Sequence, residues 1–131
     1  MKIAIASSGK NLDSSVDPRF GRCPYYLIVD SETDKFEMME NTAGRGFRGV
    51  GVSAAQMVAN KGVKVVIAGN FGPNAVNVLT AGGIKIFTTS NLSLTVKQAL
   101  EQYKKNELQS ATAATIPFGP AAGGGWGRKG N

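Results

Sequence analysis

The most constraining feature of the sequence is a pair of short apolar runs, residues 63–68 and 84–88, separated by a stretch with helical spacing. The first run is nearly all apolar and rich in β-branched residues, and it is too short for a helix. Such a run is typical of a parallel strand that is covered on both faces. Pro73 can open a helix and Gly82-Gly83 can end one, so the two runs predict a strand–helix–strand unit.

The residues around this unit add three strands and two helices. Residues 3–6 predict a buried strand, and residues 25–30 and 35–40, joined by a polar four-residue turn, predict an antiparallel hairpin. Helical spacing of apolar residues begins at Val50 and again after a cap at Ser93 or Thr95. Right-handed crossovers make the two strands of the unit parallel to the first strand. We therefore expect an α/β fold with a mixed five-stranded sheet and three helices.

The chain has the length of a single domain. Its 131 residues include 42% apolar and 18% charged residues, a balance that excludes a disordered polyelectrolyte. We expect a domain over residues 1–105 and a flexible tail over residues 106–131, because six glycines fall between positions 119 and 131. No apolar run is long enough to span a bilayer or to form the core of a signal peptide, so we expect a cytoplasmic location.

The residue counts exclude several kinds of chemistry. The chain has no histidine and a single cysteine, so it cannot form a Ser-His-Asp triad, a Cys-His pair or a Cys/His zinc site by itself. The formal net charge of +6 favours anionic partners, but it is too small to indicate nucleic acid. We expect a monomer or a weak dimer with no membrane partner.

Three loops are expected to meet at one edge of this sheet. They follow the strands that run parallel and cover residues 7–23, 69–73 and 88–93. Ligands of open α/β sheets bind beyond the carboxyl ends of such strands. The strand ends themselves carry no acidic residue, which argues against two-metal hydrolysis. This edge therefore predicts a binding site.

The most specific stretch is residues 17–26, DPRFGRCPYY. Its two prolines stiffen the backbone, and Arg19 and Arg22 can present planar donor forks to an anion. Cys23 has two interpretations. It could be a thiolate ligand of a metal, because nearby arginines lower the pKa of a thiol. It could also be a small buried hydrophobic residue, which composition alone favours.

Two further loops resemble phosphate-binding motifs incompletely. Residues 44–49 spell G-x-G-x-x-G, but the strand before them is the return arm of a hairpin, and no acidic residue near position 70 could hold a ribose. The alternatives to a dinucleotide-binding loop are a plain flexible loop and an anion clamp formed by Arg45 and Arg48. Residues 7–10, SSGK, lack the spacing of a nucleotide phosphate loop.

Four blocks of sequence carry a resemblance to a known family: residues 1–9, 19–26 (RFGRCPYY), 66–75 (VIAGNFGPNA) and 81–86 (AGGIKI). Together they resemble the dinitrogenase iron–molybdenum cofactor biosynthesis family, which includes nitrogenase cofactor carriers, small single-domain members and the orange protein that holds a molybdenum–copper–sulfide cluster. The resemblance implies a ribonuclease-H-like three-layer fold. Its five strands, numbered along the chain, lie in the order 3-2-1-4-5 with strand 2 antiparallel. It also implies binding or carriage of a metal–sulfur species without catalysis.

The chain departs from its relatives in lacking imidazole ligands. Arg19 stands where many members have histidine, and Arg45 and Arg48 occupy a loop where others carry histidine. The resemblance then implies capture of a preformed anionic cluster by guanidinium and backbone N–H groups, with Cys23 as a candidate metal ligand. The expected cofactor-binding residues are Ser7, Ser8, Gly9, Lys10, Arg19, Arg22, Cys23, Arg45, Arg48, Gly69, Asn70 and Gly72.

The expected ligand is a molybdenum- or iron-containing sulfide cluster, or its precursor, bound non-covalently, and the expected protein partner takes part in cofactor assembly. Two other functions remain open. One is a nucleotide- or phosphometabolite-binding protein that uses the glycine-rich loop over residues 44–49. The other is a protein-interaction module whose tail acts as a tether.

Overall fold

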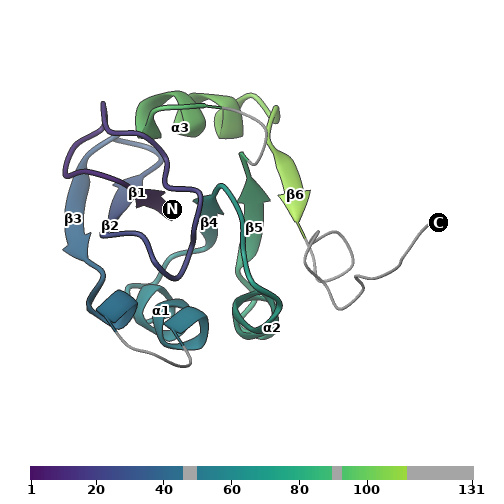
Figure 1. Ribbon diagram of the computed structural model, residues 1–131. Coiled ribbons are helices and arrows are strands. Elements are labelled where there is room, and N and C mark those ends of the chain that lie inside the picture. The colour runs from purple at the N-terminus through teal and green to yellow at the C-terminus, as the bar shows by residue number, and fades with distance from the viewer. Residues whose placement is uncertain (46–49, 90–92, 112–131) are drawn as a thin grey trace.

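The computed structural model describes residues 1–45, 50–89 and 93–111, which form one mixed sheet with helices on both of its faces (Figure 1). The strands are β1 (Lys2–Ser7), β2 (Tyr25–Asp30), β3 (Phe36–Glu40), β4 (Val65–Ala68), β5 (Lys85–Thr88) and β6 (Gln109–Ala111). The helices are α1 (Val50–Ala59), α2 (Pro73–Ala81) and α3 (Val96–Lys104), with a short 3₁₀ helix, η1 (Thr42–Arg45), after β3.

The strand order is β3-β2-β1-β4-β5-β6. β1 runs antiparallel to β2 and parallel to β4, and the register places Ile5 between Leu27 and Ile67. The expected order of the first five strands and the antiparallel second strand are therefore confirmed, as are the three helices.

The expected number of strands was wrong, because the sheet has six strands where five were predicted. The sixth, β6, pairs antiparallel with β5 and falls within residues 106–131, the segment expected to be a flexible tail. It is only three residues long, and its sequence Gln-Ser-Ala contains no strong β-former. Its stability depends on pairing with β5 and on burial of Leu108 and Ala111, which a local pattern cannot reveal.

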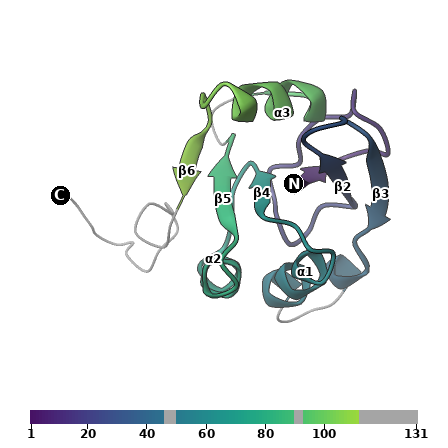
Figure 2. The same cartoon turned by 180° about the vertical axis from the view of Figure 1, so that it is seen from behind.

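The sheet separates two hydrophobic clusters. α1 and α2 cover one face and α3 covers the other, as both views show (Figures 1 and 2). On the first face the sheet contributes small side chains, including Ala4, Ala6 and Ala68. On the other face larger residues such as Ile5 pack with Leu100 of α3. The alternation follows from the two-residue period of a strand.

The helix starts agree with the local sequence signals. Pro73 lies in the first turn of α2 after Gly72, the N-cap residue. Thr95 caps α3, and its side chain and that of Gln98 form a reciprocal capping box. Within the described residues no helix has both the length and the apolar character needed to cross a bilayer.

Candidate functional site

The segment after Val16 crosses the carboxyl ends of β1 and β4. The Asp17 N–H donates to the Ala6 carbonyl (2.9 Å), and the Gly69 N–H donates to the Asp17 carbonyl (3.1 Å). The Phe20 N–H then donates to the Asn70 carbonyl (3.1 Å). These backbone bonds join residues 17–20 to the loop between β4 and α2, so the two loops form one rigid surface at this edge of the sheet.

A cleft of about 440 Å³ opens on this surface. One wall is the loop over residues 18–22, and the other is formed by residues 70–72 before α2 and by Val50-Gly51 at the start of α1. Phe20 and Phe71 stack inside, with ring centroids 5.1 Å apart. The cleft therefore combines an aromatic floor with the first residues of α1 and the residues that lead into α2.

The charge around the cleft is positive. Arg19 and Arg22 line it, and neither α1 nor α2 has an acidic residue in its first turn. Helix N-termini carry partial positive charge and attract anions. Among the described residues that line the cleft, none is Asp, Glu, Cys or His.

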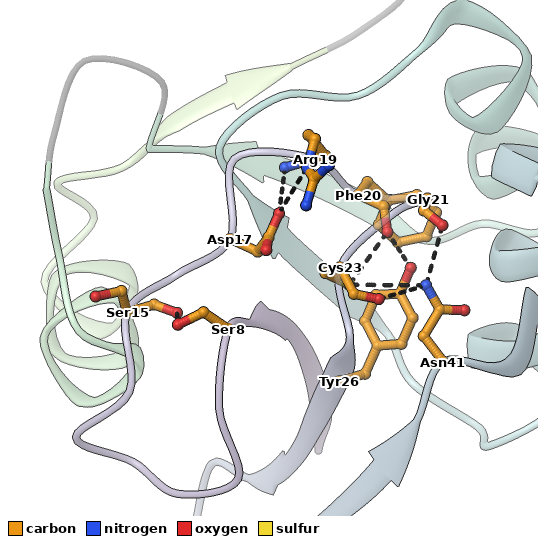
Figure 3. Close-up of polar contacts among 9 residues, drawn as sticks. All are labelled: Ser8, Ser15, Asp17, Arg19, Phe20, Gly21, Cys23, Tyr26 and Asn41. Carbon is orange, nitrogen blue, oxygen red and sulfur yellow. Dashed lines mark hydrogen bonds and ion pairs between the residues drawn. The ribbon is translucent and has the colours of Figure 1, made fainter. Parts of the chain in front are cut away.

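Asp17 lies beside the cleft and holds one of these arginines. Its carboxylate accepts the Arg19 backbone N–H (2.8 Å), and the Arg19 Nε is 3.5 Å from the same oxygen (Figure 3). The Asp17 side chain is only 6% exposed, whereas the Arg19 side chain is 64% exposed. Asp17 thus holds the backbone N–H and the Nε of Arg19 in place, while most of the Arg19 side chain stays exposed at the surface.

A polar network lies beneath the loop, on the side facing the protein interior. The Phe20 carbonyl accepts hydrogen bonds from the Tyr26 hydroxyl and from the Cys23 thiol (Figure 3). The Asn41 side-chain Nδ2 donates to the carbonyls of Gly21 (3.0 Å) and Cys23 (2.8 Å). Tyr26 and Asn41 are both buried, so this network is shielded from solvent.

Cys23 belongs to this interior network and does not line the cleft. It is 1% exposed, and burial raises the pKa of its thiol to about 12. The expectation that nearby arginines lower this pKa was wrong, because desolvation of the thiolate dominates. The structure therefore favours the second interpretation of Cys23, a small buried residue, and the described residues contain no cluster of His, Cys, Asp and Glu that could hold a metal ion.

At the end of β1 and in the loop after it, the polar groups of Ser7 and Ser8 form hydrogen bonds with other residues of this loop. Ser7 is buried, and its hydroxyl bonds to the Gly9 carbonyl (2.7 Å) and accepts the Gly9 N–H (3.2 Å). The Ser8 N–H and hydroxyl both donate to the Ser15 carbonyl (3.0 and 3.2 Å). Lys10 lies over the Tyr25 ring, with its Nζ 5.7 Å from the centroid. These residues shape the strand end and are not part of the cleft lining.

The structure thus brings together four of the twelve expected binding residues: Arg19, Arg22, Asn70 and Gly72. Gly69 is buried beneath the loop, against Pro18. The backbone of Arg45 ends η1, and Arg48 lies outside the described residues.

Other residues that shape the site were not among the predicted ones. Phe20 and Phe71 each precede a glycine within the motifs RFGR and NFGPN, which is the signal that could have identified them. Gly51 approaches Gly21 so closely that a Cβ on Gly21 would stand 3.1 Å from the Gly51 Cα. No local pattern identifies Asn41, because its partners lie about twenty residues earlier in the chain.

The comparisons with known proteins agree with this architecture. A family model described as "dinitrogenase iron-molybdenum cofactor" matches residues 1–106. The chain belongs to this family. An uncharacterised protein of Methanocaldococcus jannaschii is 37% identical over 97 residues, which cover 72% of this chain and 79% of that protein. Family membership implies involvement in binding related to the iron–molybdenum cofactor, and the family is one of accessory and binding proteins.

Two solved structures are similar in both sequence and fold. The apo form of the orange protein from Desulfovibrio gigas has a TM-score of 0.79 and 37% identity, covering 84% of this chain and 92% of that chain. A Thermotoga protein provisionally described as NifB has a TM-score of 0.73 and 36% identity, covering 83% of this chain and 91% of that chain.

Proposed function

We propose that this protein binds an anionic metal–sulfur cluster of the molybdenum or iron sulfide type, or its precursor, in the cleft beside Arg19 and Arg22. It carries this cargo chemically unchanged to a cofactor-assembly partner. The observation on which the proposal rests is the lining of the cleft, where two arginines, the first residues of α1 and the N-cap residue of α2 border one space. Family membership supports a cargo related to the iron–molybdenum cofactor.

The electrostatics of the cleft favour reversible binding. A hydrogen bond to a charged group contributes about 1.5–3 kcal/mol, and a helix N-terminus contributes about 0.3–1 kcal/mol toward an anion. Two of each give a gross attraction of about 4–8 kcal/mol, part of which is offset by the loss of translational and rotational freedom on binding. Binding of this strength suits a carrier, because the cargo can be released to the next protein.

The donor set of the cleft suits a cargo that brings its own ligands. The described lining residues offer guanidinium groups, an amide side chain and backbone N–H groups, none of which is a usual ligand for a transition-metal ion such as iron, copper or molybdenum. A cluster whose metals are already bound by sulfide presents an anionic surface that these donors can bind without a coordinate bond. The cleft is therefore better suited to a preformed cluster than to a bare metal ion.

The aromatic floor adds selectivity for a soft anion. Phe20 and Phe71 are almost completely buried and stack against each other at one side of the cleft. Transfer of an anion to an apolar surface costs less when its charge is spread over large, polarisable atoms, because less hydration is lost. Sulfide-rich species meet this condition better than phosphate or molybdate.

The test is a titration of the purified protein with tetrathiomolybdate in the presence of copper. We expect a coloured complex, and we expect the double variant Arg19→Ala/Arg22→Ala to bind at least about tenfold more weakly. The double variant Lys64→Ala/Lys97→Ala is the matched control, because both lysines are exposed, lie outside the cleft and remove the same charge. Equal losses in the two double variants would indicate only a general charge effect and would contradict the proposal.

The nucleotide alternative is tested on the same protein by thermal unfolding. A ligand that binds only the folded state raises the unfolding midpoint. We expect tetrathiomolybdate to raise the midpoint and NAD and ATP to leave it unchanged. The opposite result would favour a nucleotide-binding protein.

A further inference from the structure

Several carbonyl groups of the arginine-bearing loop accept hydrogen bonds from the loop itself or from the buried network beneath it. The Arg19 carbonyl accepts the N–H groups of Arg22 (3.3 Å) and Cys23 (3.1 Å). The Phe20 carbonyl accepts the Tyr26 hydroxyl and the Cys23 thiol (3.4 Å). The partial negative charge of the Arg19 oxygen is therefore compensated within the loop, and that of the Phe20 oxygen by the buried network beneath it.

Asn41 completes this arrangement on both sides of Arg22. Its Nδ2 lies 3.0 Å from the Gly21 oxygen and 2.8 Å from the Cys23 oxygen, and its backbone N–H donates to the Pro24 carbonyl (2.9 Å) (Figure 3). One residue thus holds three carbonyls of a four-residue segment. The Gly21 carbonyl belongs to the peptide group immediately before Arg22, and the Cys23 carbonyl belongs to the peptide group between Cys23 and Pro24. Asn41 therefore fixes the backbone on both sides of Arg22, and this limits the direction in which the Arg22 side chain leaves it.

Asn41 also occupies a rigid position, from which it can hold these carbonyls in a fixed orientation. It is 4% exposed and directly follows β3, whose last residue, Glu40, pairs with Tyr25 of β2. An amide side chain is suited to the role because one NH₂ group carries two donors for two acceptors. A carboxylate of the same shape has no donor and would repel both carbonyl oxygens.

We infer that Asn41 is a positioning residue for anion binding: it turns the carbonyls on either side of Arg22 inward, so that the cleft presents guanidinium groups instead of carbonyl oxygens. This inference rests on the proposed function of the cleft. Asn41 itself does not line the cleft and acts through the loop that carries Arg22.

The test compares three variants of the full chain. Asn41→Asp keeps the side-chain shape and removes both donors, and Asn41→Ala removes them without adding charge. Asn60→Asp is the matched control, because Asn60 is exposed just after α1 and gains the same charge. Amide resonances are recorded without ligand, and tetrathiomolybdate affinity is measured well below the unfolding midpoint of each variant.

We expect both Asn41 variants to shift the amide resonances of Arg22 and Cys23 and to weaken tetrathiomolybdate binding about tenfold, with the control unchanged. A merely structural role predicts a lower unfolding midpoint with an unchanged dissociation constant, and that result would overturn the inference. Unchanged Arg22 resonances in the ligand-free variants would also overturn it. If the wild-type protein binds no tetrathiomolybdate, the proposed function fails, while the ligand-free resonances still decide whether Asn41 positions the loop.

Discussion

Gly69 lies so close to Pro18 that a Cβ at position 69 would stand 2.5 Å from the Pro18 Cα. The contact is between backbone atoms, so neither partner can move aside by changing a rotamer. It is the point at which the loop bearing the arginines is pressed onto the end of β4. Glycine is therefore required here by close approach of two chain segments.

Substitution of Gly69 tests this contact. We expect Gly69→Ala to destabilise the protein by about 1–3 kcal/mol, because overpacking forces a backbone shift. For a domain of this size the unfolding midpoint should fall by roughly 4 °C per kcal/mol. Gly82→Ala is the control, since a Cβ there meets its nearest atom, the Leu79 oxygen, at an ordinary 3.5 Å. Equal midpoints for the two variants would show that the loop does not depend on this contact.

The carboxylate of Asp17 should weaken anion binding. It lies beside the cleft and its Oδ1 is 3.5 Å from the Arg19 Nε. Asn at this position can still accept the Arg19 backbone N–H but carries no negative charge. We expect Asp17→Asn to bind tetrathiomolybdate severalfold more tightly at low salt, with the difference shrinking as ionic strength rises. Weaker binding by this variant at every salt concentration would indicate that the carboxylate is needed to hold the loop.

Burial of Cys23 predicts a loss of stability in alkali. The folded-state pKa of about 12 exceeds the ordinary thiol pKa, so the unfolded chain releases this proton first as the pH rises. The stabilisation is therefore complete below about pH 8.5 and is lost progressively up to the folded-state pKa. We expect the free energy of unfolding, measured with urea from pH 8 to 11, to fall less steeply in Cys23→Ala. Parallel pH profiles would contradict a buried, protonated thiol.

Truncation tests the contribution of β6. A chain that ends at residue 106 lacks Leu108 and Ala111, which are buried, and leaves β5 without its antiparallel neighbour. We expect it to be at least about 2 kcal/mol less stable than a chain that ends at residue 111, because burying one Leu side chain alone contributes about that much. Urea unfolding of the two truncated chains measures the difference, and equal stabilities would mean that β6 is dispensable.

Much of the fold follows from local patterns in the sequence. Pro73 and Thr95 identify helix starts by their own chemistry, and the parallel direction of β1, β4 and β5 follows from crossover handedness. The strand order was implied by the resemblance to a known family. β6 could not be predicted, because its three residues form a strand only through pairing with β5. Convergence of Arg19 and Arg22 on one edge of the sheet was predictable because they lie in the loop after the first strand.

The parts of the site that escaped prediction depend on long-range geometry. Ser8 is a plausible anion donor by sequence, yet both of its donors bond to the Ser15 carbonyl. Cys23 follows two arginines in the chain, but its side chain points inward, where desolvation raises its pKa. Asn41 contacts the loop across roughly twenty residues of sequence. In each case the direction in which a side chain or a backbone group points decides its role. The local order of residues does not determine that direction.

The central claim is that the cleft between the arginine-bearing loop and the starts of α1 and α2 is where an anionic metal–sulfur species binds. The most direct test is to add tetrathiomolybdate and copper to isotope-labelled protein and map the amide resonances that move. We expect the largest shifts to fall on residues 19–22 and 70–75 and to need at least about tenfold more ligand in Arg19→Ala/Arg22→Ala. Shifts confined to residues 7–10, or spread over the exposed lysines of α3, would contradict it.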